Sequence, residues 1–220
     1  MTVVPGYIRM KPNTAPAFMA ASIALLAKFA GAPSRIRRIA ALVPLVIGAG
    51  TMFQYVTGLS LHLDQMFFDD PVQKIYPGRM AHLTAINFVL LGLALLWRTK
   101  RVSIERKRLG DTIALLVAIS SLLAIVGYLY GVPLLYGSIK HTAMAFHTGL
   151  SFLLLSLAVV FIDPRGAVAS LFWSRKAGGV VARRLLPAAI LIPIGLGRVF
   201  VSDTFDFNNL RMGMELEVVA

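Results

Sequence analysis

The sequence has no cysteine and few charged residues, and each deficit narrows the class of protein. Without cysteine the chain forms neither a disulfide nor a thiolate metal site. Charged residues make up only 15% of the 220 residues, whereas a soluble domain carries about 25%. Apolar residues reach 57%, and the mean hydropathy is +0.75. These proportions disfavour a water-soluble globule and predict an integral membrane protein.

Enzyme signatures are also missing from the sequence. It contains no glycine-rich phosphate loop, no HExxH zinc pair and no GxSxG nucleophile elbow. No segment resembles the phosphoacceptor and ATP-binding domains of a kinase. We therefore expect a protein without catalysis and without a bound cofactor.

Long apolar segments dominate what is present. A membrane-spanning helix needs roughly 20 mostly apolar residues, and strands of a membrane barrel would alternate instead. The sequence predicts an all-α, polytopic transmembrane helix bundle. Its six predicted spans are Thr14–Ala32, Ile39–Leu59, Leu83–Trp97, Thr112–Tyr130, Thr142–Ile162 and Leu185–Val201. Prolines 44, 187 and 193 lie inside spans, where they predict kinks.

The distribution of charge predicts the orientation of these spans. Lysine and arginine accumulate in cytoplasmic loops, and most of the 22 basic residues fall at residues 28–38, 98–108 and 165–184. Most acidic residues lie in the other connections. Both termini are therefore expected on the outer side of the membrane, with residues 1–220 forming one membrane domain and 202–220 an outward tail. The net charge of +12 favours membrane lipids as partners rather than nucleic acid, because no basic domain is present.

A short motif recurs three times. Methionine, three residues, threonine, a small residue, two residues and phenylalanine occur at 10–18, 80–88 and 144–152. Each copy opens an odd-numbered span, and Tyr-x-x-Gly closes the second and fourth spans at 55–58 and 128–131. We predict three tandem helical hairpins in one orientation, at about 10–60, 80–131 and 144–201.

The spacing of the motif places its methionine, threonine and phenylalanine on one helix face, so the three copies can line a common centre. Two interpretations are open. The threonines pack and bond their own i−4 carbonyls, or they line a ligand pocket. Gln54, Asn87 and His147 are expected to bond between helices, and the loop at 61–79 is either an interfacial connector or a lid. The candidate pocket residues are Thr14, Phe18, Asp64, Thr84, Asn87, Phe88, His147, Thr148 and Phe152.

Several of these segments resemble a known family. The segments that carry the resemblance are the run from Tyr55 through Asp64 to Phe67, Pro77–Met80, Leu91–Leu96, Met144–Thr148, Asp163–Pro164 and Gly178–Pro193. They are similar to the multi-helix membrane input region of bacterial sensor histidine kinases and some diguanylate cyclases. The resemblance implies signal input in a bacterial inner membrane, with no established binding residues. It also implies an extra helix on each side, which is not evident here, so we expect a fragment, a degenerate relative or a subunit.

We therefore predict a non-catalytic sensory module that signals by helix repacking. With an outward C-terminus, it would act on a cytoplasmic kinase or cyclase through another membrane subunit, or as a homo-oligomer. Two alternatives stay open. A small transporter or channel would place charges along a pathway within the membrane. A b-type haem protein would need His147 and a second histidine such as His82 at matching depth.

Overall fold

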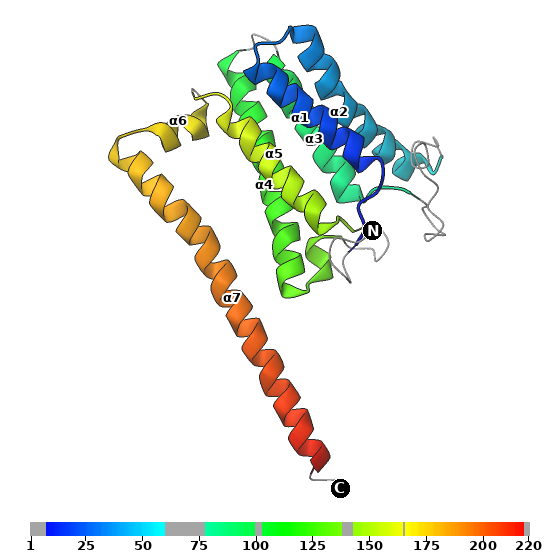
Figure 1. The fold of residues 1–220 in the computed structure, drawn as a ribbon, viewed down its shortest axis with the longest axis vertical. Helices are drawn as coiled ribbons and strands as arrows, with labels where there is room; N and C mark the ends of the chain where they lie inside the picture. Colours follow the sequence, from blue (N-terminus) through cyan, green and yellow to red (C-terminus); the bar gives the residue numbers. More distant parts are fainter. Residues whose placement is uncertain (1–7, 60–77, 100–102, 138–142, 165, 218–220) are drawn as a thin grey trace.

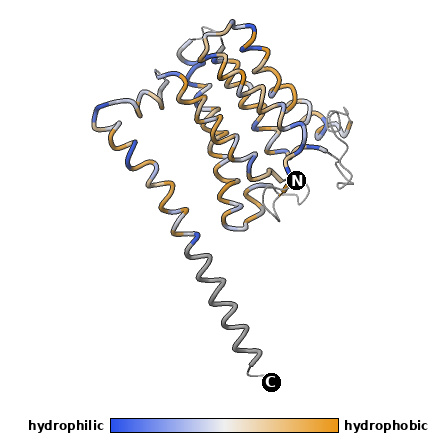
Figure 2. The backbone as a smooth tube through the Cα atoms, viewed as in Figure 1, coloured by the Kyte–Doolittle hydropathy of each residue, from blue (hydrophilic) through white to orange (hydrophobic). Residues whose placement is uncertain are grey.

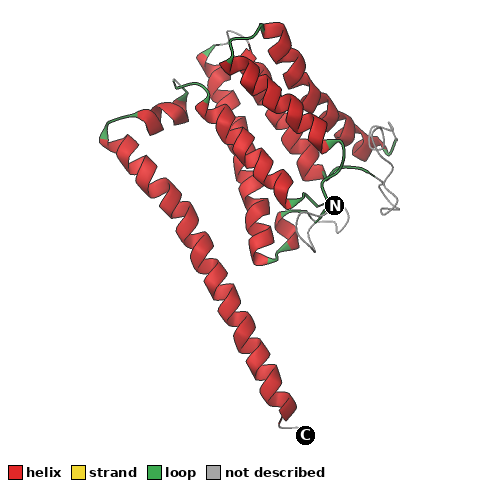
Figure 3. Ribbon diagram, in the orientation of Figure 1, coloured by secondary structure: helices red, strands yellow, loops and turns green. Residues whose placement is uncertain are grey.

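All regular structure in the described part of the chain is helical (Figure 3). The computed structural model describes residues 8–59, 78–99, 103–137, 143–164 and 166–217. The elements are α1 (Thr14–Phe29), α2 (Ser34–Thr57), α3 (His82–Thr99), α4 (Ile104–Tyr130), the 3₁₀ turn η2 (Pro133–Leu135), α5 (Phe146–Phe161), α6 (Ala167–Trp173) and α7 (Ala177–Glu217). The predicted all-α class is confirmed for these residues.

Helices α1 to α5 form one bundle, and α7 leaves it (Figure 1). Helix α2 packs against α1 and α3, and α4 packs against α3 and α5. The short α6 connects α5 to α7, whose second half extends beyond the bundle (Figure 1). Near its middle, α7 touches α4, where the Tyr130 hydroxyl donates a hydrogen bond to the Ile194 carbonyl at 2.7 Å.

Each predicted span falls on a helix, but the boundaries differ. Helices α2 and α4 begin several residues before the predicted spans, because arginine and lysine are strong helix formers and continue the helix into the basic segments. The last predicted span is part of one helix of 41 residues that runs unbroken through both prolines and through most of the predicted tail. The sequence did not predict α6 and η2.

Three helices are long and apolar enough to cross a membrane, namely Ser34–Thr57, Glu105–Tyr130 and Ala177–Arg198. The apolar helices Thr14–Phe29, His82–Arg98 and Phe146–Phe161 are shorter. Apolar residues run along most of the length of the bundle helices (Figure 2). The structure thus suggests a membrane protein.

The distribution of side chains supports the same environment. Small residues such as Ala17 and Ala21 are fully buried, whereas Leu26 and Val56 are 66% and 81% exposed. A soluble protein rarely leaves so much apolar surface in contact with water. Small residues between helices and large apolar residues outside them are typical of helices that pack in lipid.

Two glycines bring α2 and α3 into close contact. A Cβ atom added to Gly48 would lie 2.6 Å from the Ala85 carbonyl oxygen, and one added to Gly92 would lie 2.7 Å from the Leu45 Cβ. Ala85 is the small residue that follows the motif threonine of α3. The small residue of the motif thus lies where two helices approach each other closely.

Replacing Gly48 with alanine should therefore destabilise the bundle by about 1–3 kcal/mol, because the new methyl group meets backbone that cannot move aside cheaply. Thermal unfolding in detergent measures the effect. Gly195→Ala is the matched control, since a Cβ there meets nothing within 4 Å and alanine favours a helix. Equal stability of the two variants would contradict the close contact.

Candidate functional site

The phenylalanines of the three motifs meet at the centre of the bundle. The ring centroids of Phe18 and Phe88 are 4.8 Å apart, those of Phe18 and Phe152 are 4.7 Å apart, and those of Phe88 and Phe152 are 4.6 Å apart. Phe88 and Phe152 are completely buried. These distances and the tilted ring planes are typical of favourable aromatic pairs. The short helices α1, α3 and α5 therefore converge on one aromatic cluster.

The motif threonines line one small cavity at the N-terminal ends of the same helices. Thr14, Thr84 and Thr148 are only 1–3% exposed. The other lining residues are Arg9, Met10, Lys11, Met80, Ala81, Ala143 and Ala145. The space between them holds about one water-sized sphere. We call this space the threonine cavity.

The threonine hydroxyls at the cavity make no hydrogen bond to any residue that the structure describes. By contrast, Thr51, Thr57 and Thr112 each donate to the carbonyl four residues earlier, at 2.8–3.1 Å. The interpretation that the motif threonines bond their own i−4 carbonyls is therefore wrong. The hydroxyls of three nearly buried residues share one cavity, so a polar group bound there would find three hydrogen-bond partners.

Two tyrosines bond to the carbonyls four residues before two of the motif threonines. The Tyr55 hydroxyl donates to the Met80 carbonyl at 2.8 Å, four residues before Thr84. The Tyr128 hydroxyl donates to the Met144 carbonyl at 2.7 Å, four residues before Thr148. Both tyrosines belong to the Tyr-x-x-Gly segments, whose glycines end α2 and α4 with φ of 73° and 66°. The last turns of α2 and α4 thus support the entry into α3 and α5.

The other predicted polar residues behave differently from one another. Asn87 forms the predicted interhelical bond, since its side-chain oxygen accepts from the Ser120 hydroxyl at 2.8 Å. Gln54 is fully buried, yet neither its amide oxygen nor its amide nitrogen has a partner in the described part of the chain. The prediction for Gln54 is therefore wrong.

The histidine prediction fails in a similar way. His147 is half-buried, its imidazole bonds to none of the described residues, and it does not line the threonine cavity, so it is not the predicted interhelical donor. The His82 ring stacks on Tyr55, with centroids 3.5 Å apart. Within the described ranges no three histidine, aspartate or glutamate side chains gather to hold a metal. Asp64, with most of the predicted loop at 61–79, lies outside the described residues.

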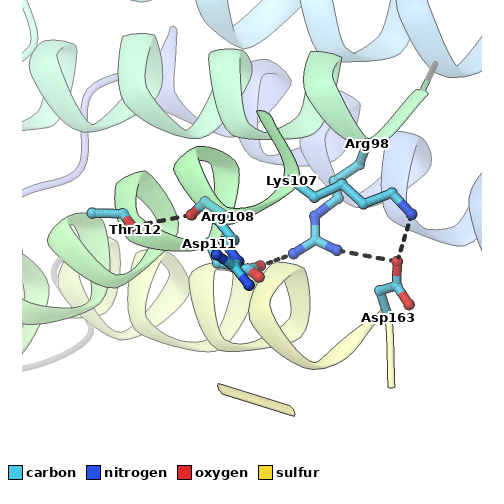
Figure 4. Close-up of polar contacts among 6 residues, drawn as sticks. All are labelled: Arg98, Lys107, Arg108, Asp111, Thr112 and Asp163. Carbon is cyan, nitrogen blue, oxygen red and sulfur yellow. Dashed lines mark hydrogen bonds and ion pairs between the residues drawn. The ribbon is translucent and has the colours of Figure 1, made fainter. Parts of the chain in front are cut away.

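Sequence reasoning missed a buried charge network at the opposite end of the bundle (Figure 4). Arg98, in the last turn of α3, forms an ion pair with Asp111 of α4, and the two side chains are 4% and 5% exposed. Asp163, just after α5, lies 3.8 Å from Arg98 and 3.6 Å from Lys107 of α4. The network joins the ends of three helices, and within the described part of the chain it contains two positive and two negative side chains.

Backbone geometry brings the acidic partners together. A Cβ atom at Gly166 would lie 3.1 Å from the Asp111 Oδ2 atom and 3.1 Å from the Asp163 carbonyl oxygen, so glycine lets the turn after α5 approach α4. The sequence does carry a signal for the network. Asp111 and Asp163 are acidic residues at the strongly basic end of their helices, away from most of the other carboxylates.

The chain matches no protein family, no curated protein and no solved structure. The resemblance to sensor input regions therefore stays a prediction.

Replacing Asp111 with alanine should destabilise the bundle by about 3–5 kcal/mol, because it leaves the buried Arg98 guanidinium without its main countercharge. Lys107→Ala, which removes a more exposed partner, should cost less than about 1 kcal/mol. Thermal unfolding in detergent compares the variants. The double variant Arg98→Met, Asp111→Leu should recover most of the loss; a double variant as unstable as the sum of its single variants would contradict this account.

Proposed function

We propose that the chain is a non-catalytic sensory input module of a bacterial inner membrane, with six spans built as three hairpins and both ends outside. A ligand that enters between α1, α3 and α5 at the threonine cavity favours one of two helix packings. A partner then reads the difference, either a cytoplasmic kinase or cyclase reached through another membrane subunit, or a second copy of the chain.

One observation carries this proposal: helices α3 and α5 connect two polar sites at opposite ends of the bundle. Their N-terminal turns supply Thr84 and Thr148 to the cavity. Their C-terminal ends place Arg98 and Asp163 in the charge network. A shift of either helix at the cavity therefore changes the geometry of the network. A ligand drives such a shift through its different affinities for the two packings.

The six-span part of the proposal has to account for the short odd helices. Helices α1 and α5 have 16 residues each, or about 24 Å at 1.5 Å per residue, which is less than the hydrocarbon thickness of about 30 Å. Non-helical backbone is tolerated at membrane depth where protein buries it or where it lines a cavity. The residues before α3 and α5, Arg79–Ala81 and Ala143–Ala145, are buried. Met80, Ala81, Ala143 and Ala145 among them line the threonine cavity. They extend the odd helices to the outer boundary.

A small transporter is the second candidate, and the buried Arg98–Asp111 pair favours it. Ionisable groups buried within membrane helices often mark a transport path. The pair lies at one end of the bundle, with Arg98 in the last turn of α3, and none of the described residues that line the threonine cavity is a carboxylate. A path would need groups between these two sites. Uptake of labelled solutes into vesicles that contain the chain separates this candidate from a sensor.

The absence of cysteine makes the proposed topology directly testable. We expect cysteines placed at Arg38 and Lys176 to react with a membrane-impermeant maleimide only after cells are permeabilised. A cysteine placed at Leu134, which is 76% exposed, should react in intact cells. The unmodified chain is the control, since it contains no thiol. Labelling of all three positions from the same side would contradict the topology.

The signalling mechanism is tested by spin labels at positions 38 and 176. The distance distribution between them should contain two populations, and Thr84→Val should change their ratio without reducing membrane insertion. Thr51→Val is the matched control, because this threonine is equally buried but bonds within its own helix. A single distribution that is the same in all three proteins would contradict helix repacking.

A further inference from the structure

The threonine cavity lies where the positive ends of three helices meet. Helices α1, α3 and α5 begin at residues 14, 82 and 146, next to the lining residues Thr14, Ala81 and Ala145. The first N–H groups of a helix have no partner within the helix and carry partial positive charge. At α1 the N–H groups of Thr14 and Ala15 already donate to the carbonyls of Lys11 and Pro12, at 3.0 and 3.3 Å, which leaves fewer open donors there. The N-cap residues of α1 and α5 make no side-chain hydrogen bond to those groups. The local field therefore favours negative charge.

The charged side chains around the cavity are positive as well. Among the residues that the structure describes, its lining includes the cationic Arg9 and Lys11 and no carboxylate. Thr14, Thr84 and Thr148 add three hydroxyls, each more than nine-tenths buried and without a partner among the residues that the structure describes. Hydroxyl oxygens are able to coordinate a cation, but three positive helix ends and two cationic side chains oppose one. Hydroxyl protons can all turn toward an anion instead.

We infer that the threonine cavity binds a small anion between the hydroxyls of Thr14, Thr84 and Thr148, with Arg9 and Lys11 at its rim. The space fits about one water-sized sphere, so the bound group is a halide ion or one oxygen of a carboxylate or phosphate. This inference rests on the proposed function, for which it supplies the chemical class of the stimulus. Charged acceptors also form stronger hydrogen bonds than neutral ones, which favours an anion over a water molecule.

The experiment uses the purified full chain in lipid nanodiscs. Its thermal unfolding is followed as sodium gluconate, whose anion is too large for the cavity, is replaced at constant ionic strength by sodium chloride, acetate or phosphate. We expect a saturable rise in Tm, since a ligand that binds only the folded state stabilises it. A rise with chloride identifies a halide, and a rise with acetate or phosphate alone identifies an oxyanion.

Variants assign the effect to the cavity. Thr84→Val keeps the shape and removes one donor, so the half-saturating anion concentration should rise about tenfold or more. Thr84→Ser retains the hydroxyl, so its half-saturating anion concentration should stay close to that of the parent. The same holds for Thr51→Val, because Thr51 lies outside the cavity lining. The inference is overturned if the parent protein has the same Tm in all anions, or if its Tm changes when potassium or choline replaces sodium. It is also overturned if Thr51→Val weakens the anion effect as much as Thr84→Val does.

The two proposals fail in different ways. If anion binding depends on Thr84 but leaves the spin-label distances unchanged, the anion site stands and the sensory function is wrong. If the spin-label distances change in Thr84→Val but do not change with any of the anions, the sensory function stands and the anion site is wrong.

Discussion

Contact among three aromatic rings is the interaction on which the rest of the structure depends. Phe18, Phe88 and Phe152 come from three separate helices and lie within 4.8 Å of one another. In lipid, helices gain little from burying apolar surface, and close packing drives their association. The rings fill the centre, while glycine and alanine residues around them let α2 approach α3. Once the three short helices meet there, their N-terminal turns are forced together at one end.

That convergence brings polar groups into places where lipid would not tolerate them alone. At one end it encloses three threonine hydroxyls, and the carbonyls four residues before Thr84 and Thr148 accept hydrogen bonds from tyrosines. At the other end it gathers Arg98 and Lys107 with Asp111 and Asp163 into one charge network. Isolated charges buried in this way are costly, and paired ones cost much less. A rigid aromatic centre with a polar site at each end can transmit a change from one site to the other.

The sequence predicted the helices and their shared face, but only part of the site. Hydropathy located six helical segments because lipid selects long apolar runs, and the spacing of the motif placed its threonines and phenylalanines on one side. The predicted starts of α2 and α4 came too late along the chain, since arginine and lysine continue a helix beyond its apolar part. Hydrogen-bond partners were not predictable. Whether Thr84 bonds its own helix depends on Tyr55 from another helix, and the pairing of Arg98 with Asp111 depends on how α3 and α4 cross. Gln54 and Asn87 look alike in the sequence, yet only Asn87 faces a partner.

Cross-linking within the aromatic cluster tests the central claim most directly. Because the chain lacks cysteine, pairs of cysteines can replace Phe18 with Phe88, Phe18 with Phe152, and Phe88 with Phe152, each treated in membranes with a short thiol-specific cross-linker. The account predicts that all three pairs react, whereas a pair at the outward-facing Met19 and Leu154 does not. Reaction of only one of the three pairs would show that α1, α3 and α5 do not share a centre, and the cavity at their ends would lose its basis.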